Sequence, residues 1–249
     1  MSERRRHSNA TCLYTHDSTT TKGQMNDNST TYAIIFDMDG VLIDTHQAHY
    51  ESWLVMTEEA GLSFSYEDFR RTFGRTSREI IVHFWGETGL SDADVARMDD
   101  AKEVAFRRII KADFPAMPHA RELLKELHEA GFAMAVGSSG PPENVQLVVD
   151  QFDARDLFGA LVTATDVTEG KPDPQVFQIA AERLGVPPER CVVIEDAVHG
   201  VEAAHRAGMT AVGLAADQEA FEALSAADLV VDSLDKLSAE KLRELADRE

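Results

Sequence analysis

Short apolar runs alternate with helix-like segments through the second half of the chain, and this alternation restricts the fold more than any other feature. The apolar runs have the length of buried strands, and the segments between them carry apolar residues at helical spacing. Repeated strand–helix units imply right-handed crossovers and a parallel sheet that helices cover on both faces. The sequence therefore predicts an α/β fold with a doubly wound parallel sheet. Its strands are expected at 32–36, 132–136, 161–163, 191–194, 210–213 and 228–231.

Residues 46–116 interrupt this alternation, because helix-like segments follow one another there with no strand between them. We interpret 46–116 as a helical cap domain inserted into an α/β core made of residues 31–45 and 117–249. The segments around 44–45 and 116–118 would then be hinges that let the cap open and close over the core. The cap helices are expected at 45–60, 65–73, 77–85 and 91–111.

Residues that favour helix starts precede two of the cap helices. Thr45 is the expected N-cap of the first cap helix, and Ser91 with Asp94 fits a capping box for the last. In the core, glycines or prolines end most of the helical patterns. Core helices are expected at 119–130, 144–151, 174–184 and 198–207, with a C-terminal helix from about 234.

A formal net charge of −20 and a hydrophobic share of 43% indicate a globular chain with an acidic surface. This acidity argues against a surface for nucleic acid or anionic membranes. The chain has two cysteines, Cys12 and Cys191, which provide neither a disulfide framework nor the spacing of a metal site. No apolar stretch approaches the roughly 18 to 20 residues of a membrane span. We therefore expect a cytoplasmic protein without a nucleic-acid or membrane partner, whose oligomeric state stays open and for which a monomer is compatible.

Residues 1–30 differ in composition from the rest of the chain. They are rich in Ser, Thr and Asn, with an arginine cluster at 4–6, and such a segment does not bury enough apolar surface to order itself. We interpret 1–30 as a disordered leader, with a basic targeting arm as the alternative. Met25 lies just before the first strand, and we hypothesise that translation begins there. The intact mass of the natively expressed protein tests this.

Asp37 and Asp39 follow directly on the apolar run 32–36, where a buried strand is expected to end in a turn. In an open parallel sheet, ligands collect at the carboxyl ends of the strands. Two carboxylates separated by one residue can project to the same side of an extended backbone and share a divalent cation with a substrate. With Mg²⁺ bound, one carboxylate could attack phosphorus while the other moves a proton.

Three further polar clusters follow predicted strands. Ser138 lies among glycines and hydroxyls that suit a phosphate oxygen. Lys171 stands before a helix and is followed by two prolines that limit its backbone, and its ammonium could neutralise a phosphoryl group there. Glu195 and Asp196 end the clearest buried strand of the second half and offer oxygen ligands to a hard cation. Each cluster alone is also compatible with an ordinary turn or helix start, but their joint placement at strand ends is a poor match to chance.

The four clusters resemble the motifs of the haloacid dehalogenase (HAD) superfamily, over about residues 32–231. The match rests on Asp37 to Thr45, Ser138, Lys171 and the Glu195-Asp196 pair. The chain is similar to the branch with a helical cap that contains beta-phosphoglucomutase and small phosphatases. This resemblance implies a Rossmann-like core and an aspartyl-phosphate mechanism.

The resemblance also implies a role for each motif residue. Asp37 would be the nucleophile and Asp39 the general acid and base. Ser138 and Lys171 would bind the phosphoryl group. The cofactor would be Mg²⁺, held by Asp37, the backbone carbonyl of Asp39 and Asp196, with Glu195 beside this metal set. Dehalogenases of the superfamily lack the second aspartate, so Asp39 favours phosphate esters over carbon–halogen bonds.

The cap would choose the substrate. His49 and Trp53 lie on one face of the first cap helix and match positions near the active site of beta-phosphoglucomutases. Arg75 and Arg78 resemble their cap loop, where Arg78 would hold a distal phosphate, and Lys102 falls near another substrate position. Each of these five side chains is equally compatible with packing or with a solvated helix surface.

The mutase pattern is incomplete in this chain. Mutases carry Ser-x-Ser-Lys-Asn after the second motif, where this chain has Ser138-Ser-Gly-Pro-Pro-Glu-Asn144, and they carry asparagine where this chain has Glu103. We therefore expect a Mg²⁺-dependent phosphatase of a small phosphorylated metabolite of the sugar phosphate class. The alternatives are a beta-phosphoglucomutase and, from a different class, a regulatory binding module that has lost turnover.

Overall fold

The structure is a computed structural model, which describes residues 31–72 and 75–247 of the chain. The expected leader at 1–30, with Cys12 and Met25, lies outside the described residues. Two long stretches of the described chain differ in secondary structure. All strands of the parallel sheet lie before residue 37 or after residue 132, and the regular elements described between residues 46 and 112 are helices.

A six-stranded parallel sheet forms the centre of the fold, in the order β3-β2-β1-β4-β5-β6. This confirms the predicted α/β fold and doubly wound sheet. Phe36 at the end of β1 pairs with Val136 of β2 and Ile194 of β4, so the ends of these three central strands are in register. The strands are β1 (Ala33–Phe36), β2 (Ala133–Gly137), β3 (Ala160–Val162), β4 (Cys191–Glu195), β5 (Thr210–Leu214) and β6 (Leu229–Val231).

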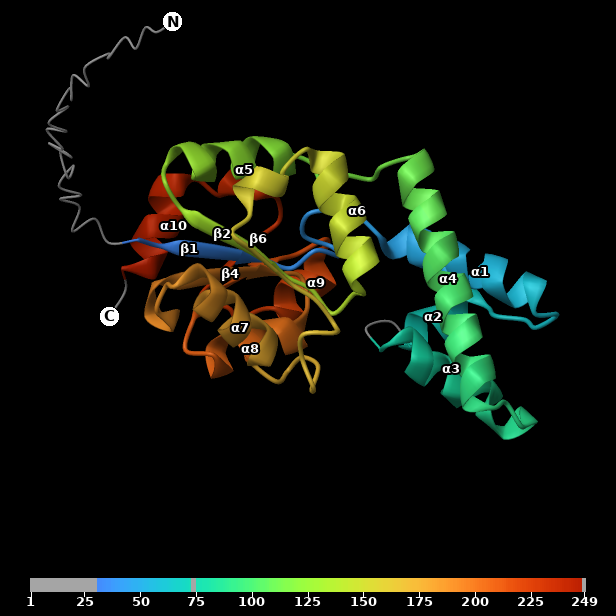
Figure 1. Ribbon diagram of the computed structural model, residues 1–249. Helices are drawn as coiled ribbons and strands as arrows, with labels where there is room; N and C mark the ends of the chain where they lie inside the picture. The colour runs from blue at the N-terminus through green and yellow to red at the C-terminus, as the bar shows by residue number, and fades with distance from the viewer. Residues whose placement is uncertain (1–30, 73–74, 248–249) are drawn as a thin grey trace, which may run out of the picture. The chain divides into compact units, whose positions relative to one another are not determined.

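Helices cover both faces of the sheet, as Figure 1 shows. Ile34 and Phe36 of β1 face one apolar core, which α5, α6 and α10 complete. Ile35 faces the opposite core, which α7 and α8 complete. Side chains alternate between the two faces of a strand, so a short run without polar residues fits a sheet that is buried on both sides. These helices are α5 (Ala120–Glu129), α6 (Pro142–Phe152), α7 (Gln175–Leu184), α8 (Val198–Arg206) and α10 (Ala239–Ala246).

Residues 46–112 form a helical block with an apolar cluster of its own. Trp53, Phe69, Ile81 and Trp85 are buried in this cluster. The two segments that join the block to the sheet run side by side, because Met117 N–H donates to Leu42 O at 2.9 Å. The block contains α1 (His46–Glu59), α2 (Tyr66–Thr72), α3 (Ser77–Trp85) and α4 (Asp92–Ala112). Its helices lie where predicted, while its division from the core as a separate domain stays a prediction.

Some helix ends differ from the sequence prediction. The Thr45 side chain makes no capping bond at the start of α1, whereas Ser91 and Asp94 form the predicted capping box of α4. Helix α6 begins at Pro142, because proline at the first helical position costs no hydrogen bond. The expected helix from about 234 begins as a 3₁₀ turn, Leu234–Lys236, before α10. Helix α9 (Gln218–Ala223), which Asp217 caps, was not predicted.

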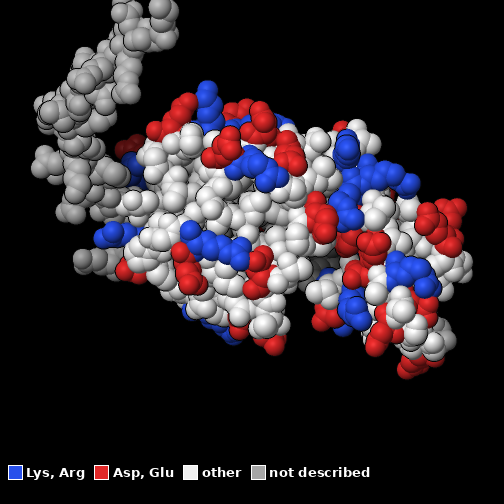
Figure 2. All heavy atoms as spheres, viewed as in Figure 1, with Lys and Arg blue, Asp and Glu red and all other residues white. Residues whose placement is uncertain are grey.

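Acidic and basic side chains alternate on the surface that Figure 2 shows, rather than gathering into one patch of a single sign. Within residues 31–72 and 75–247, no helix has both the length and the apolar character that a membrane crossing requires.

Candidate active site

Lys171 joins the ends of the three central strands. Its Nζ donates to Oδ1 of Asp37 at 2.6 Å, to Oε1 of Glu195 at 2.7 Å and to the carbonyl oxygen of Gly137 at 3.1 Å. These partners follow or end β1, β4 and β2, and the Lys171 side chain is 3% exposed. Charge-assisted hydrogen bonds of this length hold a lysine firmly. The structure thus brings together three residues that the sequence placed on separate motifs.

Ser138 lies in the turn that follows β2 and is 1% exposed. Its N–H donates to Val162 O at 3.0 Å, which extends the pairing of β2 with β3. Its Oγ accepts the N–H of Gly140 at 3.0 Å, so the side chain is already oriented within the turn. Helix α6 begins four residues after Ser138, at Pro142. The hydroxyl therefore lies near the start of a helix, where anions are favoured.

Buried carboxylates outnumber the lysine that neutralises them. Burial raises the pKa of Asp37 to about 7, against the opposing charge of Lys171. Burial and the neighbouring Glu195 carboxylate raise the pKa of Asp196 well above its usual range. Burial also opposes the charge of Lys171, but contact with Asp37 and Glu195 raises its pKa above the usual range. A site with these shifts favours an additional cation.

The carboxyl group of Asp196 lies against the backbone of Gly40. A Cβ at Gly40 would lie 2.0 Å from Oδ2 of Asp196, and the positive φ of 74° also favours glycine there. This close approach places an acidic oxygen beside the turn that carries Asp37 and Asp39. Hard cations prefer such oxygen donors, so the residues present fit Mg²⁺.

Glu195 already uses both carboxylate oxygens within the protein. Oε1 accepts from Lys171 and Oε2 accepts the N–H of Ala197 at 2.9 Å. A Cβ at Gly200 would lie 1.9 Å from Glu195, so α8 packs closely over this side chain. In the described part of the chain, no three His, Cys, Asp or Glu side chains group as a metal site. The expected set differs from such a group, because it combines the Asp37 and Asp196 side chains with a backbone carbonyl.

His49 of the helical block reaches Asp39. Its Nε2 lies 3.4 Å from Oδ1 of Asp39, and its Nδ1 lies 2.9 Å from Nζ of Lys102. An ammonium group can only donate, so we assign the proton of a neutral His49 to Nε2, where it faces the carboxylate. Burial and the Lys102 charge lower the pKa of His49, which favours this neutral form.

The pKa of Asp39 is lowered in this arrangement, which favours its charged form. Burial favours its neutral form, but the hydrogen bonds with His49 and Thr45 and the charge of Lys102 hold its pKa below the usual range. Thr45 makes no capping bond because its backbone is helical (φ −98°, ψ −3°), whereas an N-cap residue has an extended backbone.

Aromatic side chains fix the position of His49 and Lys102. The ring of Phe106 stacks on His49 with centroids 4.2 Å apart and planes 9° apart. Lys102 is 2% exposed, and its Nζ lies 5.2 Å from the Phe106 ring and 5.8 Å from the Trp53 ring. Trp53 itself is 2% exposed within the apolar cluster of the block. Its surroundings are those of a packing residue.

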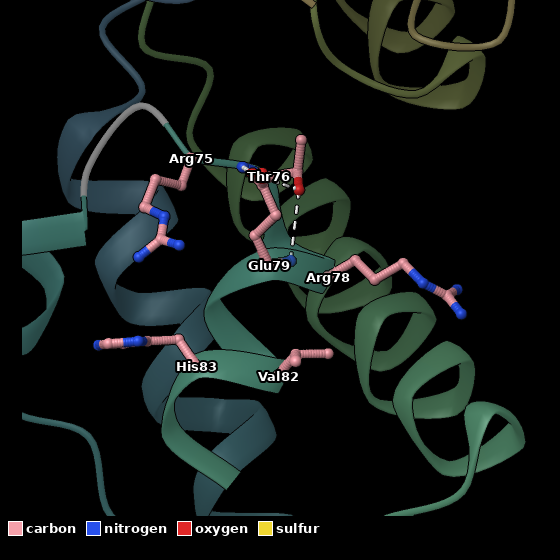
Figure 3. A pocket seen from close by; sticks show the side chains of 6 residues that line it. All are labelled: Arg75, Thr76, Arg78, Glu79, Val82 and His83. Carbon is pink, nitrogen blue, oxygen red and sulfur yellow. Dashed lines mark hydrogen bonds between the residues drawn. The ribbon is translucent and has the colours of Figure 1, made fainter. Parts of the chain in front are cut away.

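Arg75 and Arg78 do not converge. They line a surface pocket of about 340 Å³ with Thr76, Glu79, Val82 and His83. Figure 3 shows their guanidinium groups pointing in different directions from the start of α3. Nη2 of Arg78 lies 4.0 Å from a carboxylate oxygen of Asp92, and the Arg78 side chain is 52% exposed. The expected grip of Arg78 on a distal phosphate stays a prediction.

The site includes polar residues that the sequence did not single out as candidates. Glu103 and Asn144 hydrogen bond to each other at 2.7 Å, between α4 and α6. Ser77 and Arg107 extend this contact. The sequence marked Glu103 and Asn144 only through the departures from the mutase pattern, and Glu103 and Arg107 lie four residues apart on one face of α4.

Comparison with known proteins agrees with this geometry. The model of the haloacid dehalogenase-like hydrolase family matches residues 32–208. Beta-phosphoglucomutase of Bacillus subtilis is 33% identical over 218 residues, which cover 85% of this chain and 94% of that protein. The crystal structure of CbbY from Rhodobacter sphaeroides in complex with phosphate has a TM-score of 0.79 and 27% identity, and the match covers 86% of this chain and 100% of that chain.

A plant relative is similar over part of its length. The chloroplastic 5-amino-6-(5-phospho-D-ribitylamino)uracil phosphatase of Arabidopsis thaliana is 34% identical over 220 residues, which cover 86% of this chain and 57% of that protein. The chain thus spans little more than half of this relative.

The match over residues 32–208 includes the ends of β1, β2 and β4, where the candidate site lies. The chain belongs to the haloacid dehalogenase-like hydrolases, within the beta-phosphoglucomutase-like branch of phosphoryl-transfer enzymes.

Proposed function

We propose that the protein is a Mg²⁺-dependent phosphatase that hydrolyses a small phosphorylated metabolite, of the sugar phosphate class, through an aspartyl phosphate. One observation carries this proposal. Lys171 holds Asp37 at the carboxyl edge of the sheet, where Ser138, Asp39 and Asp196 also lie. A nucleophile, a proton carrier, a phosphate-binding hydroxyl and a fixed cation in one place are the parts that phosphoryl transfer requires.

In the first step, a carboxylate oxygen of Asp37 attacks phosphorus and the ester P–O bond breaks. The leaving oxygen takes a proton from Asp39, which acts as the general acid in its protonated form. Lys171 and the Ser138 hydroxyl stabilise the charge on the phosphoryl oxygens. The products of this step are an alcohol and the Asp37 acyl phosphate.

In the second step, a water oxygen attacks the same phosphorus and the bond to Asp37 breaks. The water proton moves to Asp39, and inorganic phosphate leaves. The low pKa of Asp39 beside His49 describes the base form that this step uses. The proton that Asp39 gains replaces the proton that it gave in the first step, so the cycle closes.

Mg²⁺ would be held by Asp37, Asp196 and the backbone carbonyl of Asp39. When bound, it would offset the negative charge that the carboxylates and the phosphate bring together. The raised pKa values of Asp37 and Asp196 support this assignment, because burial first and neighbouring carboxylates second oppose charges that a bound cation would offset.

The helical block favours a monophosphate over a bisphosphate. Lys102 is 2% exposed and lies 2.8 Å from Oε1 of Glu103, and Arg78 faces Asp92. Lys102, one of the three block cations that were expected to meet substrate, thus has a close acidic partner. A mutase must hold a sugar bisphosphate, whereas a phosphatase needs to hold one phosphate.

Purified protein tests the proposal with beta-glucose 1-phosphate, glucose 6-phosphate, ribose 5-phosphate and p-nitrophenyl phosphate. We expect Mg²⁺-dependent release of inorganic phosphate from at least one sugar phosphate, and none from Asp37→Asn. Asp156→Asn is the matched control, because Asp156 is exposed on a 3₁₀ turn away from the site. Full activity of Asp37→Asn, or of wild type in excess EDTA, would disprove the mechanism.

A beta-phosphoglucomutase is the second candidate, and the contact of His49 with both Asp39 and Lys102 favours it. Beta-glucose 1-phosphate with a trace of glucose 1,6-bisphosphate separates the two functions. Glucose 6-phosphate without an equal amount of free phosphate would identify a mutase. Phosphate without the isomer would identify a phosphatase.

A further inference from the structure

Glu103 is the meeting point of three helices. Its Oε1 accepts from Nζ of Lys102 and from Oγ of Ser77, each at 2.8 Å, and its Oε2 accepts from Nδ2 of Asn144 at 2.7 Å. The donors come from α4, α3 and α6. The Glu103 side chain is 14% exposed, so solvent contributes little to its hydrogen bonding. Both oxygens of this carboxylate are thus bound by the protein.

Asn144 provides the contact on the core side. It lies in the first turn of α6, is 1% exposed, and bonds two residues of α4 at once. Its Nδ2 donates to Glu103, and its Oδ1 accepts from Nη1 of Arg107 at 2.9 Å. These opposite polarities fix the orientation of the amide. The amide of Asn144 therefore matches one acceptor and one donor on successive turns of α4.

Further polar contacts connect Glu103 to Asp39, the proposed general acid and base. Lys102 is shared between Glu103 and Nδ1 of His49, and Nε2 of His49 faces Asp39. An unbroken line of polar contacts therefore runs from α6 through α4 and α1 to the turn after β1. Helix α6 also follows the Ser138 turn, so the line begins and ends at proposed catalytic motifs.

We propose that Glu103 and Asn144 are positioning residues, whose hydrogen bond holds the helical block where Lys102 and His49 align Asp39 for proton transfer. This inference rests on the proposed function. The pair acts through Lys102 and His49 rather than on the substrate. Loss of the pair should therefore impair the proton-transfer step more than phosphate binding.

The carboxylate of Glu103 and the amide of Asn144 can be exchanged between the two positions by mutation. In Glu103→Gln, an amide NH₂ can face the NH₂ of Asn144, and in Asn144→Asp two carboxylates face each other. The double variant Glu103→Gln with Asn144→Asp restores one donor and one acceptor, and it places a carboxylate beside Arg107. A rescue by the double variant would show that the hydrogen bond matters, rather than either side chain alone.

Two phosphate esters distinguish a positioning role of Glu103 and Asn144 from general damage to the active site. A sugar alkoxide needs a proton as it leaves, whereas p-nitrophenolate leaves without one. For each single variant we expect kcat/KM on the fastest sugar phosphate of the panel to fall about 100-fold, the loss that small misplacement of a catalytic group causes. On p-nitrophenyl phosphate we expect a fall of no more than about threefold, and the double variant should recover most of the loss on the sugar phosphate. Asp100→Asn, an exposed carboxylate on α4, is the matched control.

Equal losses on the two esters, or a double variant no better than the single variants, would overturn the proposal. Should a single variant fail to fold, Arg107→Met removes only the hydrogen bond between Arg107 and Asn144 and supports the same comparison.

Amide hydrogen exchange of α4 provides a readout that does not depend on turnover. We expect faster exchange in the single variants and recovery in the double variant, and unchanged exchange would also overturn the proposal. Phosphate release by the wild type tests the proposed function separately.

Discussion

Glu103 shows how one buried carboxylate is kept charged. Burial favours its neutral form, but the Lys102 charge and the hydrogen bonds from Lys102 and Asn144 hold its pKa below the usual range. A group with a lowered pKa in the folded state contributes stability above its unfolded pKa of about 4.5, and this contribution is lost as the pH falls through the folded value.

We therefore predict that Glu103→Gln loses more stability at pH 7 than at acidic pH. The difference in free energy of unfolding between wild type and Glu103→Gln should be largest above about pH 5 and should shrink as the pH falls below 4.5. Urea unfolding at a series of pH values measures it, with Asp100→Asn as control. A difference that does not change with pH would contradict the assignment.

Gly40 offers a second prediction at the scale of one residue. Gly40 and Gly61 both have positive φ, 74° and 68°, but only at Gly40 would a Cβ meet another group, Asp196 at 2.0 Å. Alanine should cost each site about 1 kcal/mol of backbone strain. We expect only Gly40→Ala to displace Asp196, and therefore to raise the Mg²⁺ concentration required for half-maximal phosphate release by at least about tenfold. The same Mg²⁺ dependence in both variants would contradict this account.

At the scale of one element, Ser91 and Thr45 show that similar helix starts differ in structure. Ser91 Oγ accepts the N–H of Asp94 at 3.2 Å, and the Asp94 carboxylate accepts the N–H of Ser91 at 3.0 Å. We predict that Ser91→Ala lowers the free energy of unfolding by about 1 kcal/mol and leaves kcat unchanged. Denaturant unfolding and phosphate release measure the two effects.

Thr45→Val is the contrasting variant, because Thr45 makes no cap and its side chain helps to lower the pKa of Asp39. It should lower kcat while α1 stays intact by circular dichroism. Unchanged kcat would show that the Thr45 hydroxyl has no part in the proposed site.

The elements that the sequence predicted well are those with a strong local pattern. The buried strands β1 and β4 are apolar runs, with Glu195 only at the end of β4, and helices α3 and α4 of the block have clear helical spacing. Helix α9 was missed because it is only six residues long and none of its residues is buried. The Thr45 cap was predicted wrongly because the backbone of Thr45 is helical, whereas an N-cap residue has an extended backbone.

The same distinction applies to the candidate site. Asp37, Ser138, Lys171 and Asp196 follow strands, and parallel strands bring their carboxyl ends to one edge, so topology alone predicted their meeting. The contact of Glu103 with Asn144 joins residues 41 positions apart on two helices. Such a contact depends on how the helices pack, which no local pattern in the sequence specifies.

At the scale of the whole molecule, the two tryptophans of the chain lie in one apolar cluster. Trp53 and Trp85 are buried in the helical block, while the cores on the two faces of the sheet contain no tryptophan. Tryptophan fluorescence therefore reports on the block, and far-ultraviolet circular dichroism reports on all elements. The two signals test whether the block is the separate domain that the sequence predicts.

If the block unfolds on its own, the two signals should follow different transitions in denaturant. Ile81 is 0% exposed in the block and Val193 is 0% exposed in β4. We predict that Ile81→Ala, at a cost of about 2 to 4 kcal/mol, moves the fluorescence transition to lower denaturant and leaves the later dichroism transition in place. Val193→Ala should instead move the dichroism transition, because it removes packing from the sheet. Coincident transitions in wild type and in both variants would mean that the block and the sheet unfold as one cooperative unit, through the paired connecting segments and the Glu103–Asn144 contact.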